Sequence, residues 1–292
     1  LKDRLDVTVL LTQADDAVPP RLSEVPVRRG RIRQAKGHLG AFEITIDGFA
    51  EPRPSSRATL SFGEGRDGAR SKADIIIDLS GGTPLFPGSA LREGYLACDP
   101  ASPAEVQRLL FRAGDLVGTF DKPRYITFKA ELCAHSRSRI VGCRRCLDLC
   151  PAGAITPAGN HVAIDVGICG GCGQCAAVCP TGAASYELPR ADLLMRQLRA
   201  MLTAYRAAGG AAAIVLLHDR DHGEALIDAA ARFSTGLPAQ VIPLAVNEVT
   251  QIGLEAIAAA FAYGAAGVRV LTRARPRRDI AGLERTIATA EP

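Results

Sequence analysis

The sequence is poor in aromatic residues: phenylalanine and tyrosine make up 5% of its 292 residues, and tryptophan is absent. It also lacks the run of roughly 20 apolar residues that a membrane-spanning helix needs, because charged residues interrupt its longest apolar stretches. The net charge of +4 is too small to indicate nucleic-acid binding. We therefore expect no membrane span and no nucleic-acid partner, in a chain long enough for two or three domains.

Cysteine, in contrast, is abundant and concentrated in one segment of the chain. Four cysteines follow the spacing C-x2-C-x2-C-x3-C-P: Cys169, Cys172, Cys175 and Cys179, before Pro180. Upstream, Cys143, Cys146 and Cys150 repeat the last three positions of this series, with Ile140 where the first cysteine would stand. Cys133 lies further upstream and is the only nearby thiol that is free to replace it.

This spacing suits a cubane iron–sulfur cluster, because three thiolates must converge on closely spaced iron atoms from one tight loop. Glycines such as Gly171 and Gly173 let the backbone approach closely, so that its amides can donate to sulfur. Zinc would favour two C-x2-C pairs separated by a longer loop, and disulfides are typical of oxidising compartments. The cysteines therefore favour iron–sulfur binding and a cytoplasmic location, or the cytoplasmic face of a membrane complex.

Residues 124 to 188 resemble the two-cluster bacterial-type ferredoxins. The resemblance implies one [4Fe–4S] cluster on Cys143, Cys146 and Cys179, with Cys133 as the substitute fourth ligand. It implies a second [4Fe–4S] cluster on Cys169, Cys172, Cys175 and Cys150. Nine residues, rather than two, separate Cys133 from Cys143, so the alternative is a [3Fe–4S] first cluster with Cys133 free. We favour ligation, because an extra thiol has no other reason to lie there.

Three further residues are candidates for a role near the clusters. Cys98 lies outside any ligand spacing and is expected to be a small buried side chain. His135, two residues after Cys133, is able to form a hydrogen bond near a cluster sulfur, whereas His161 is expected at the surface of the hairpin between the motifs. We do not expect either histidine to bind iron.

Positive charge is unevenly distributed around the cysteines. Residues 121–145 carry Lys122, Arg124, Lys129, Arg137, Arg139, Arg144 and Arg145 against only Asp121 and Glu131. No lysine or arginine occurs from Cys146 to Pro189. We expect this charge to favour the reduced first cluster and to attract an acidic redox partner to Arg137, Arg139, Arg144 and Arg145. The alternative is that these arginines only solvate an inserted loop.

The flanking regions predict a multidomain protein of mixed α/β and α+β class, with the two-cluster ferredoxin-like module at its centre, at 124–190. Residues 1–123 form an α+β region in this interpretation, with strands over 6–12, 41–49, 58–62 and 74–79 and a helix over 102–114 capped by Ser102. Residues 191–292 begin with a helix over 191–208, and apolar strands over 212–218, 240–246 and 267–272 then alternate with helices. This alternation predicts a parallel, Rossmann-like or flavodoxin-like sheet.

Ligands of such sheets bind beyond the carboxyl ends of the strands, where His218, Asp219, Asp221, Asn247 and Thr272 lie here. We expect Asp219 or Asp221 to cap a helix, and we do not expect flavin. This domain is weakly similar to the delta subunit of methyl-viologen-reducing hydrogenases, which holds a [2Fe–2S] cluster on cysteines at its strand ends. Because those cysteines are missing here, the resemblance implies a docking domain that has kept the scaffold and lost the cluster.

The string CAHSRSRIVGCRRCLDLCPAGAI and the following CGGCGQCAAVCPTGA also resemble a group of proteobacterial 4Fe–4S binding proteins. The group implies cytoplasmic electron transfer. We therefore predict an electron carrier or subunit that passes single electrons to a redox partner and has no substrate chemistry of its own. The alternatives are an assembly or maturation factor with structural or sensory clusters, and a flavin-dependent reductase.

Overall fold

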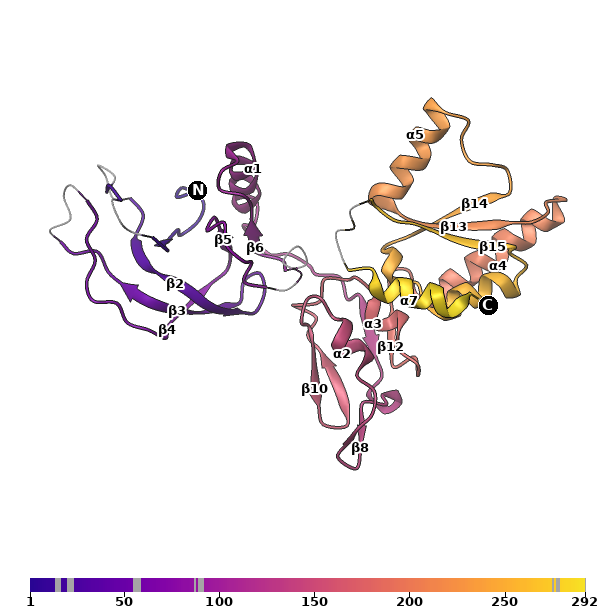
Figure 1. The fold of residues 1–292 in the computed structure, drawn as a ribbon, viewed down its shortest axis with the longest axis horizontal. Coiled ribbons are helices and arrows are strands. Elements are labelled where there is room, and N and C mark those ends of the chain that lie inside the picture. The colour runs from indigo at the N-terminus through magenta and orange to yellow at the C-terminus, as the bar shows by residue number, and fades with distance from the viewer. Residues whose placement is uncertain are drawn as a thin grey trace. The chain divides into compact units, whose positions relative to one another are not determined.

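The computed structural model describes residues 1–13, 17–19, 24–54, 59–86, 88, 92–274, 276 and 279–291 (Figure 1). The chain forms two compact units, Leu1–Lys122 and Pro123–Pro292. The second unit contains all the cysteines of the two motifs and the C-terminal parallel sheet.

The N-terminal unit is built on a four-stranded sheet. Its order is β1 (Val9–Leu11), β2 (Val27–Lys36), β3 (Phe42–Ala50) and β4 (Ala69–Ala73). β5 (Ile76–Asp78) and β6 (Tyr95–Ala97) form a separate parallel pair, which is followed by α1 (Pro103–Gly114). The rings of Phe42, Phe86 and Tyr95 pack together in the core of this unit.

Local sequence predicts this unit only in part. The strands expected over 6–12, 41–49 and 74–79 form as β1, β3 and β5, but the strand expected over 58–62 is wrong. Ala58 lies outside the described residues, and Phe62 forms only an isolated bridge with Pro52. β2 is not predicted because most of its side chains are polar or basic; pairing with β1 and β3 makes it a strand. The helix after Ser102 forms, but the Ser102 side chain accepts no capping hydrogen bond from the first turn.

The module that contains the cysteines has two halves of similar build. β7 (Ile126–Phe128), α2 (Arg145–Leu149) and β10 (Ile155–Ala158) form the first half, and β11 (His161–Ile164), α3 (Gln174–Ala177) and β12 (Ala184–Tyr186) form the second. β7 pairs antiparallel with β12, and β10 pairs antiparallel with β11. Between β7 and α2 the chain adds a short 3-10 turn, η2 (Ala130–Leu132), and a hairpin of β8 (Ser136–Arg137) and β9 (Ile140–Val141).

The C-terminal part of the second unit is a three-stranded parallel sheet of order β14-β13-β15. The strands are β13 (Ile214–Asp219), β14 (Val241–Val246) and β15 (Gly267–Leu271). The helices are α4 (Ala191–Ala207), α5 (Ala225–Phe233), α6 (Leu254–Ala262) and α7 (Ala281–Ala290), and two short turns are η3 (Arg220–Glu224) and η4 (Val249–Gln251). The predicted alternation of apolar strands with helices is therefore what the structure has.

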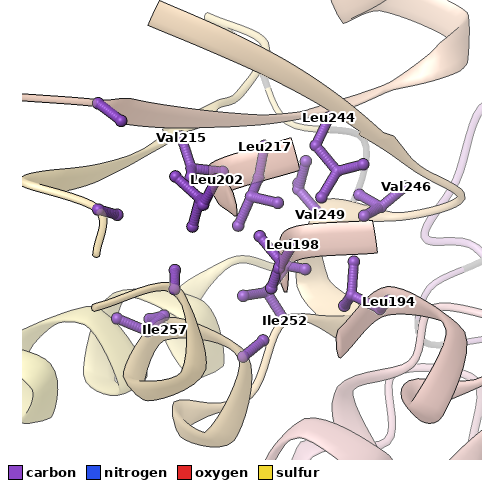
Figure 2. Close-up of a cluster of buried hydrophobic side chains, with 14 of the residues drawn as sticks. Leu194, Leu198, Leu202, Val215, Leu217, Leu244, Val246, Val249, Ile252 and Ile257 are labelled. Atoms are coloured by element: carbon purple, nitrogen blue, oxygen red, sulfur yellow. The ribbon is translucent and has the colours of Figure 1, made fainter. Parts of the chain in front are cut away.

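One face of this sheet carries the main core of the second unit (Figure 2). Alternate residues of β13, Val215 and Leu217, point to the same face and are buried, as the strand period requires. α4 covers them with Leu194, Leu198 and Leu202, which recur at helical spacing. The core fixes the sheet, and Thr250, which follows β14, and Asp279, which precedes α7, form hydrogen bonds with the cysteine module.

Candidate iron–sulfur site

The fourth cysteine of each motif lies in a turn of the same construction. After Cys150 and after Cys179 the chain runs Pro-x-Gly-Ala, and the glycines, Gly153 and Gly182, have positive φ angles of 63° and 66°. Each glycine N–H donates to the carbonyl of its cysteine, at 3.2 Å and 3.4 Å. This tight turn directs the cysteine away from its own loop and towards the other half of the module.

The Sγ atoms of these two cysteines also accept backbone hydrogen bonds, from the residue four positions ahead of Cys150 and the residue five positions ahead of Cys179. The N–H of Ala154 donates to Cys150 Sγ at 3.3 Å, and the N–H of Ala184 donates to Cys179 Sγ at 3.5 Å. Backbone donors of this kind stabilise a thiolate and orient it for a metal. Both halves of the module therefore prepare the last cysteine of the motif in a similar way.

Four thiols line one cavity at the first half of the module. They are those of Cys133, Cys143, Cys146 and Cys179, and the rest of its wall includes Phe128, His135, Arg145, Val162 and Thr181. Three of the four come from the first half of the module, and Cys179 comes from the second. These are the residues that the resemblance to ferredoxins implies for the first cluster.

The hairpin β8–β9 explains how Cys133 reaches this cavity across a gap of nine residues. Ser136 pairs with Val141, and Arg137 pairs with Ile140. The ladder continues below these strands, with the Gly142 N–H bonded to the His135 carbonyl at 2.7 Å and the Cys143 N–H bonded to the Ala134 carbonyl at 2.9 Å. Because the two ends of a hairpin lie side by side, the extra residues loop out and leave Cys133 beside Cys143.

The other four thiols gather near the buried Cys175. Its neighbours are Cys172, Cys169 and Cys150, with Cys146 of the first set next. Gly171 and Gly173 have φ angles of 72° and 75° in the intervening loop. A Cβ atom on Gly171 would lie 2.6 Å from the Tyr125 ring, and one on Gly173 would lie 2.5 Å from Gln251 Cβ, so the loop has room only for glycine at both places.

Cys146 and Cys175 lie in surroundings that disfavour the thiolate form. Burial, together with the nearby thiols of Cys143, Cys133 and Cys179, raises the pKa of Cys146 to about 11. Burial and the neighbouring thiols also raise the pKa of Cys175 well above its ordinary value. Burial of Cys179 acts in the same direction, but hydrogen bonds from Ala184 and Thr181 outweigh it and lower that pKa. Bound iron would offset this cost at Cys146 and Cys175, because a metal cation favours the thiolate form of a coordinating cysteine.

The donor set and its spacing fit an iron–sulfur cluster. All nine cysteines are described, and none is in a disulfide. Within the described part of the chain, no three or more Cys, His, Asp or Glu side chains converge on a position for a single metal ion. A mononuclear zinc site requires such convergence, with Zn–S distances of about 2.3 Å, whereas a cubane places each thiolate on a different iron.

The remaining sequence candidates take other roles. His135 is buried, at 5% exposure, and its Nδ1 donates to the Cys143 carbonyl at 3.0 Å. His161 Nδ1 donates to the neighbouring Val162 carbonyl at 3.0 Å, and its half-buried ring lies near that of Phe128. Cys98 is half-buried and packs in the N-terminal unit against Leu96 and Leu109, far along the chain from both motifs.

Residues that follow the carboxyl ends of the parallel strands form hydrogen bonds with the cysteine module and with the adjacent helical turn. Asp219 accepts the N–H groups of His222 and Gly223, at 2.5 Å and 3.1 Å, which is the predicted helix capping. Burial alone would raise the pKa of Asp219, but these bonds and nearby Arg273 lower it. Thr250 donates through Oγ1 to the Cys172 carbonyl at 2.6 Å, and Asn247 Nδ2 donates to the Tyr186 hydroxyl at 2.7 Å.

The sequence gives no signal for the roles of Thr250 and Tyr186, because each partner is distant in the chain. Tyr186 in turn donates to the Gly171 carbonyl at 2.6 Å. The buried Gln174 at the start of α3 donates to the Asp279 carbonyl at 2.7 Å, just before α7. The second cysteine loop is therefore bonded directly to the C-terminal sheet and its helices.

Comparison with known families identifies the same segment. Residues 139–183 match the family model described as a 4Fe-4S dicluster domain. This range contains Cys143 to Cys179 and excludes Cys133. These residues are therefore a ferredoxin-type 4Fe–4S module, which supports iron–sulfur binding and electron transfer in general. A search of curated proteins found no match to the chain. Within the described residues, no helix is long and apolar enough to cross a membrane.

Proposed function

We propose that this protein is an electron-transfer protein whose module holds two [4Fe–4S] clusters. The observation that carries the proposal is the division of eight thiols into two groups of four. Each group combines three cysteines of one half of the module with the Cys-Pro cysteine of the other half, Cys179 or Cys150. Crossed ligation of this kind is typical of a pair of clusters. When bound, such clusters supply one-electron redox couples.

Cys133 is the fourth ligand of the first group in this proposal. The position of the hairpin ends beside Cys143 and the place of Cys133 in the wall of the cavity support this role. Ile140, which stands where the ferredoxin spacing has its first cysteine, is 73% exposed on β9 and does not line the cavity.

We also propose that the protein is cytoplasmic and that an acidic redox partner docks next to its first group of thiols. Arg137, Arg139, Arg144 and Arg145 are exposed there, and Val141 adds an apolar side chain that is 57% exposed. Arg144 forms an exposed ion pair with Asp148 in its own helix, at 3.3 Å. The other three arginines have no ion pair among the described residues. Exposed like charge beside an apolar contact favours an acidic surface.

The C-terminal domain is, in this proposal, a Rossmann-like docking domain without a cofactor of its own. Its strand order, with the first strand between the other two, and its helical connections support that interpretation. The carboxyl ends of its strands carry no cysteine, and Asn247 and Thr250 there bind the module instead.

The test is anaerobic reconstitution of the full chain, followed by iron and sulfide counting and electron paramagnetic resonance of the reduced protein. We expect eight irons per chain and reduced-cluster signals. Seven irons would remove Cys133 from the ligand set. Fewer than seven, or no reduced-cluster signal, would overturn the proposal. A Cys98→Ser variant is the matched control and should bind the same amount of iron.

A further inference from the structure

Two carbonyl groups at equivalent positions of the two motifs are held by buried side chains. Cys143 and Cys172 are the second cysteines of their motifs. The Cys143 carbonyl accepts from His135 Nδ1 at 3.0 Å, and the Cys172 carbonyl accepts from Thr250 Oγ1 at 2.6 Å. Both donors are buried, at 5% and 3% exposure. The same peptide is thus anchored in both halves, by donors that are unrelated in sequence.

The two donors belong to different parts of the chain. His135 lies at the base of the inserted hairpin, whereas Thr250 lies in η4, after β14 of the C-terminal sheet. The second loop has an additional link to that sheet, because Tyr186 donates to the Gly171 carbonyl and accepts from Asn247. Two consecutive carbonyls of the second loop are therefore tied to the segment that follows β14.

A held carbonyl fixes the direction of the amide that shares its peptide plane. The peptide bond is planar and trans, so its N–H points opposite to its C=O. When His135 and Thr250 hold these carbonyls, they also fix the directions of the N–H groups of Arg144 and Gly173, which share the two peptide planes. Each of these N–H groups belongs to a cysteine loop, where amide donors stabilise negative charge on cluster sulfur.

We infer that His135 and Thr250 are positioning residues, each of which sets the reduction potential of one of the two redox sites. The C-terminal domain thereby controls the second site, while the inserted hairpin controls the first. The inference rests on the proposed function, because it requires a cluster at each group of thiols. Amide donors favour the more negative, reduced state, so loosening either peptide lowers the potential of its own site.

Crossed substitutions test this inference in the reconstituted full chain. Thr250→Val removes the hydroxyl and keeps the side-chain shape, whereas Thr250→Ser keeps the hydroxyl. His135→Phe removes the donor on the other side. Redox titration followed by electron paramagnetic resonance gives the midpoint potentials, and iron counting checks occupancy. We expect Thr250→Val and His135→Phe each to lower one midpoint potential, a different one in each variant, and Thr250→Ser to behave as the parent.

Tyr186→Phe provides a second route to the loop of Gly171 and Cys172 if Thr250→Val fails to fold. It removes the bond to the Gly171 carbonyl and should lower the same potential as Thr250→Val. Unchanged potentials in Thr250→Val and Tyr186→Phe, or equal shifts of both sites, would overturn the inference. That failure is distinct from failure of the proposed function, in which the parent chain itself binds too little iron or gives no reduced signal.

Discussion

Gly173 shows how closely the cysteine loop and the C-terminal domain fit together at the level of a single residue. It lies between Cys172 and the start of α3, and Gln251 of η4 occupies the space that a Cβ atom on Gly173 would need. Neither its φ angle of 75° nor the 2.5 Å approach of Gln251 Cβ tolerates a side chain. Glycine is therefore required at position 173 both for the loop conformation and for the close contact with η4 of the C-terminal domain.

We predict that Gly173→Ala destabilises the protein by about 3 kcal/mol, because a left-handed residue with a side chain costs about 1–2 kcal/mol and overpacking adds about 1–3 kcal/mol. The matched control is Gly159→Ala, in the turn between β10 and β11. Gly159 has a φ angle of 70° and open space around its Cβ position, so only the first term applies. Anaerobic urea unfolding followed by circular dichroism gives the free energy of unfolding of each variant. Equal losses of stability in the two variants would contradict the predicted cost of overpacking against Gln251.

The hairpin β8–β9 is the element that sets this module apart from the ferredoxin spacing. Its tip, Ser138-Arg139, has φ angles of 50° and 65°, as the two-residue turn of a tight hairpin requires. The strands hold Ile140 outward and return the chain to Cys143. Nine residues thus stand between Cys133 and Cys143 in place of the two residues of the ferredoxin spacing, and the hairpin still keeps the two cysteines close together.

We predict that Cys133→Ala lowers the iron content from eight to seven and converts the first site to a three-iron cluster, visible by electron paramagnetic resonance in the oxidised protein. Adding Ile140→Cys restores the ferredoxin spacing in sequence, but it should not restore the eighth iron, because β9 keeps position 140 exposed. Recovery of the eighth iron in the double variant would show that the hairpin does not hold its position.

At the scale of the whole chain, the two groups of thiols differ in the charge around them and in their contacts with the C-terminal domain. The first group lies beside the basic, exposed hairpin, whereas the second is bonded to the C-terminal domain through Thr250 and Tyr186. No lysine or arginine occurs between Cys146 and Pro189. The arrangement favours the first group as the place where a partner docks.

We predict that the Arg137→Glu, Arg139→Glu double variant slows electron exchange with an acidic one-electron carrier protein by about tenfold at low salt. The difference should shrink above 0.15 M salt, where the Debye length is about 8 Å. Arg199→Glu with Arg285→Glu makes the same change in net charge on α4 and α7 and should have little effect. Equal slowing in both double variants, measured by stopped-flow spectroscopy, would argue for net charge alone.

Local sequence patterns are enough to predict several elements of the fold. The continuous apolar run from Ala212 to Leu217 indicates a buried strand of the C-terminal sheet. The helical spacing of Leu194, Leu198 and Leu202 indicates its covering helix, because burial of one helix face imposes a regular period. β2 is not predictable in this way, because its basic side chains carry no such period and its strand conformation depends on its neighbours.

The sequence by itself determined the chemistry of this protein, because thiols at fixed short spacing have few uses other than enclosing iron and sulfide. Tertiary structure decided which distant groups meet. The place of Cys133 beside Cys143 depends on a hairpin ladder, and the bonds from His135 and Thr250 depend on packing between segments far apart in the chain. Such contacts have no local sequence period, so only the folded chain defines them.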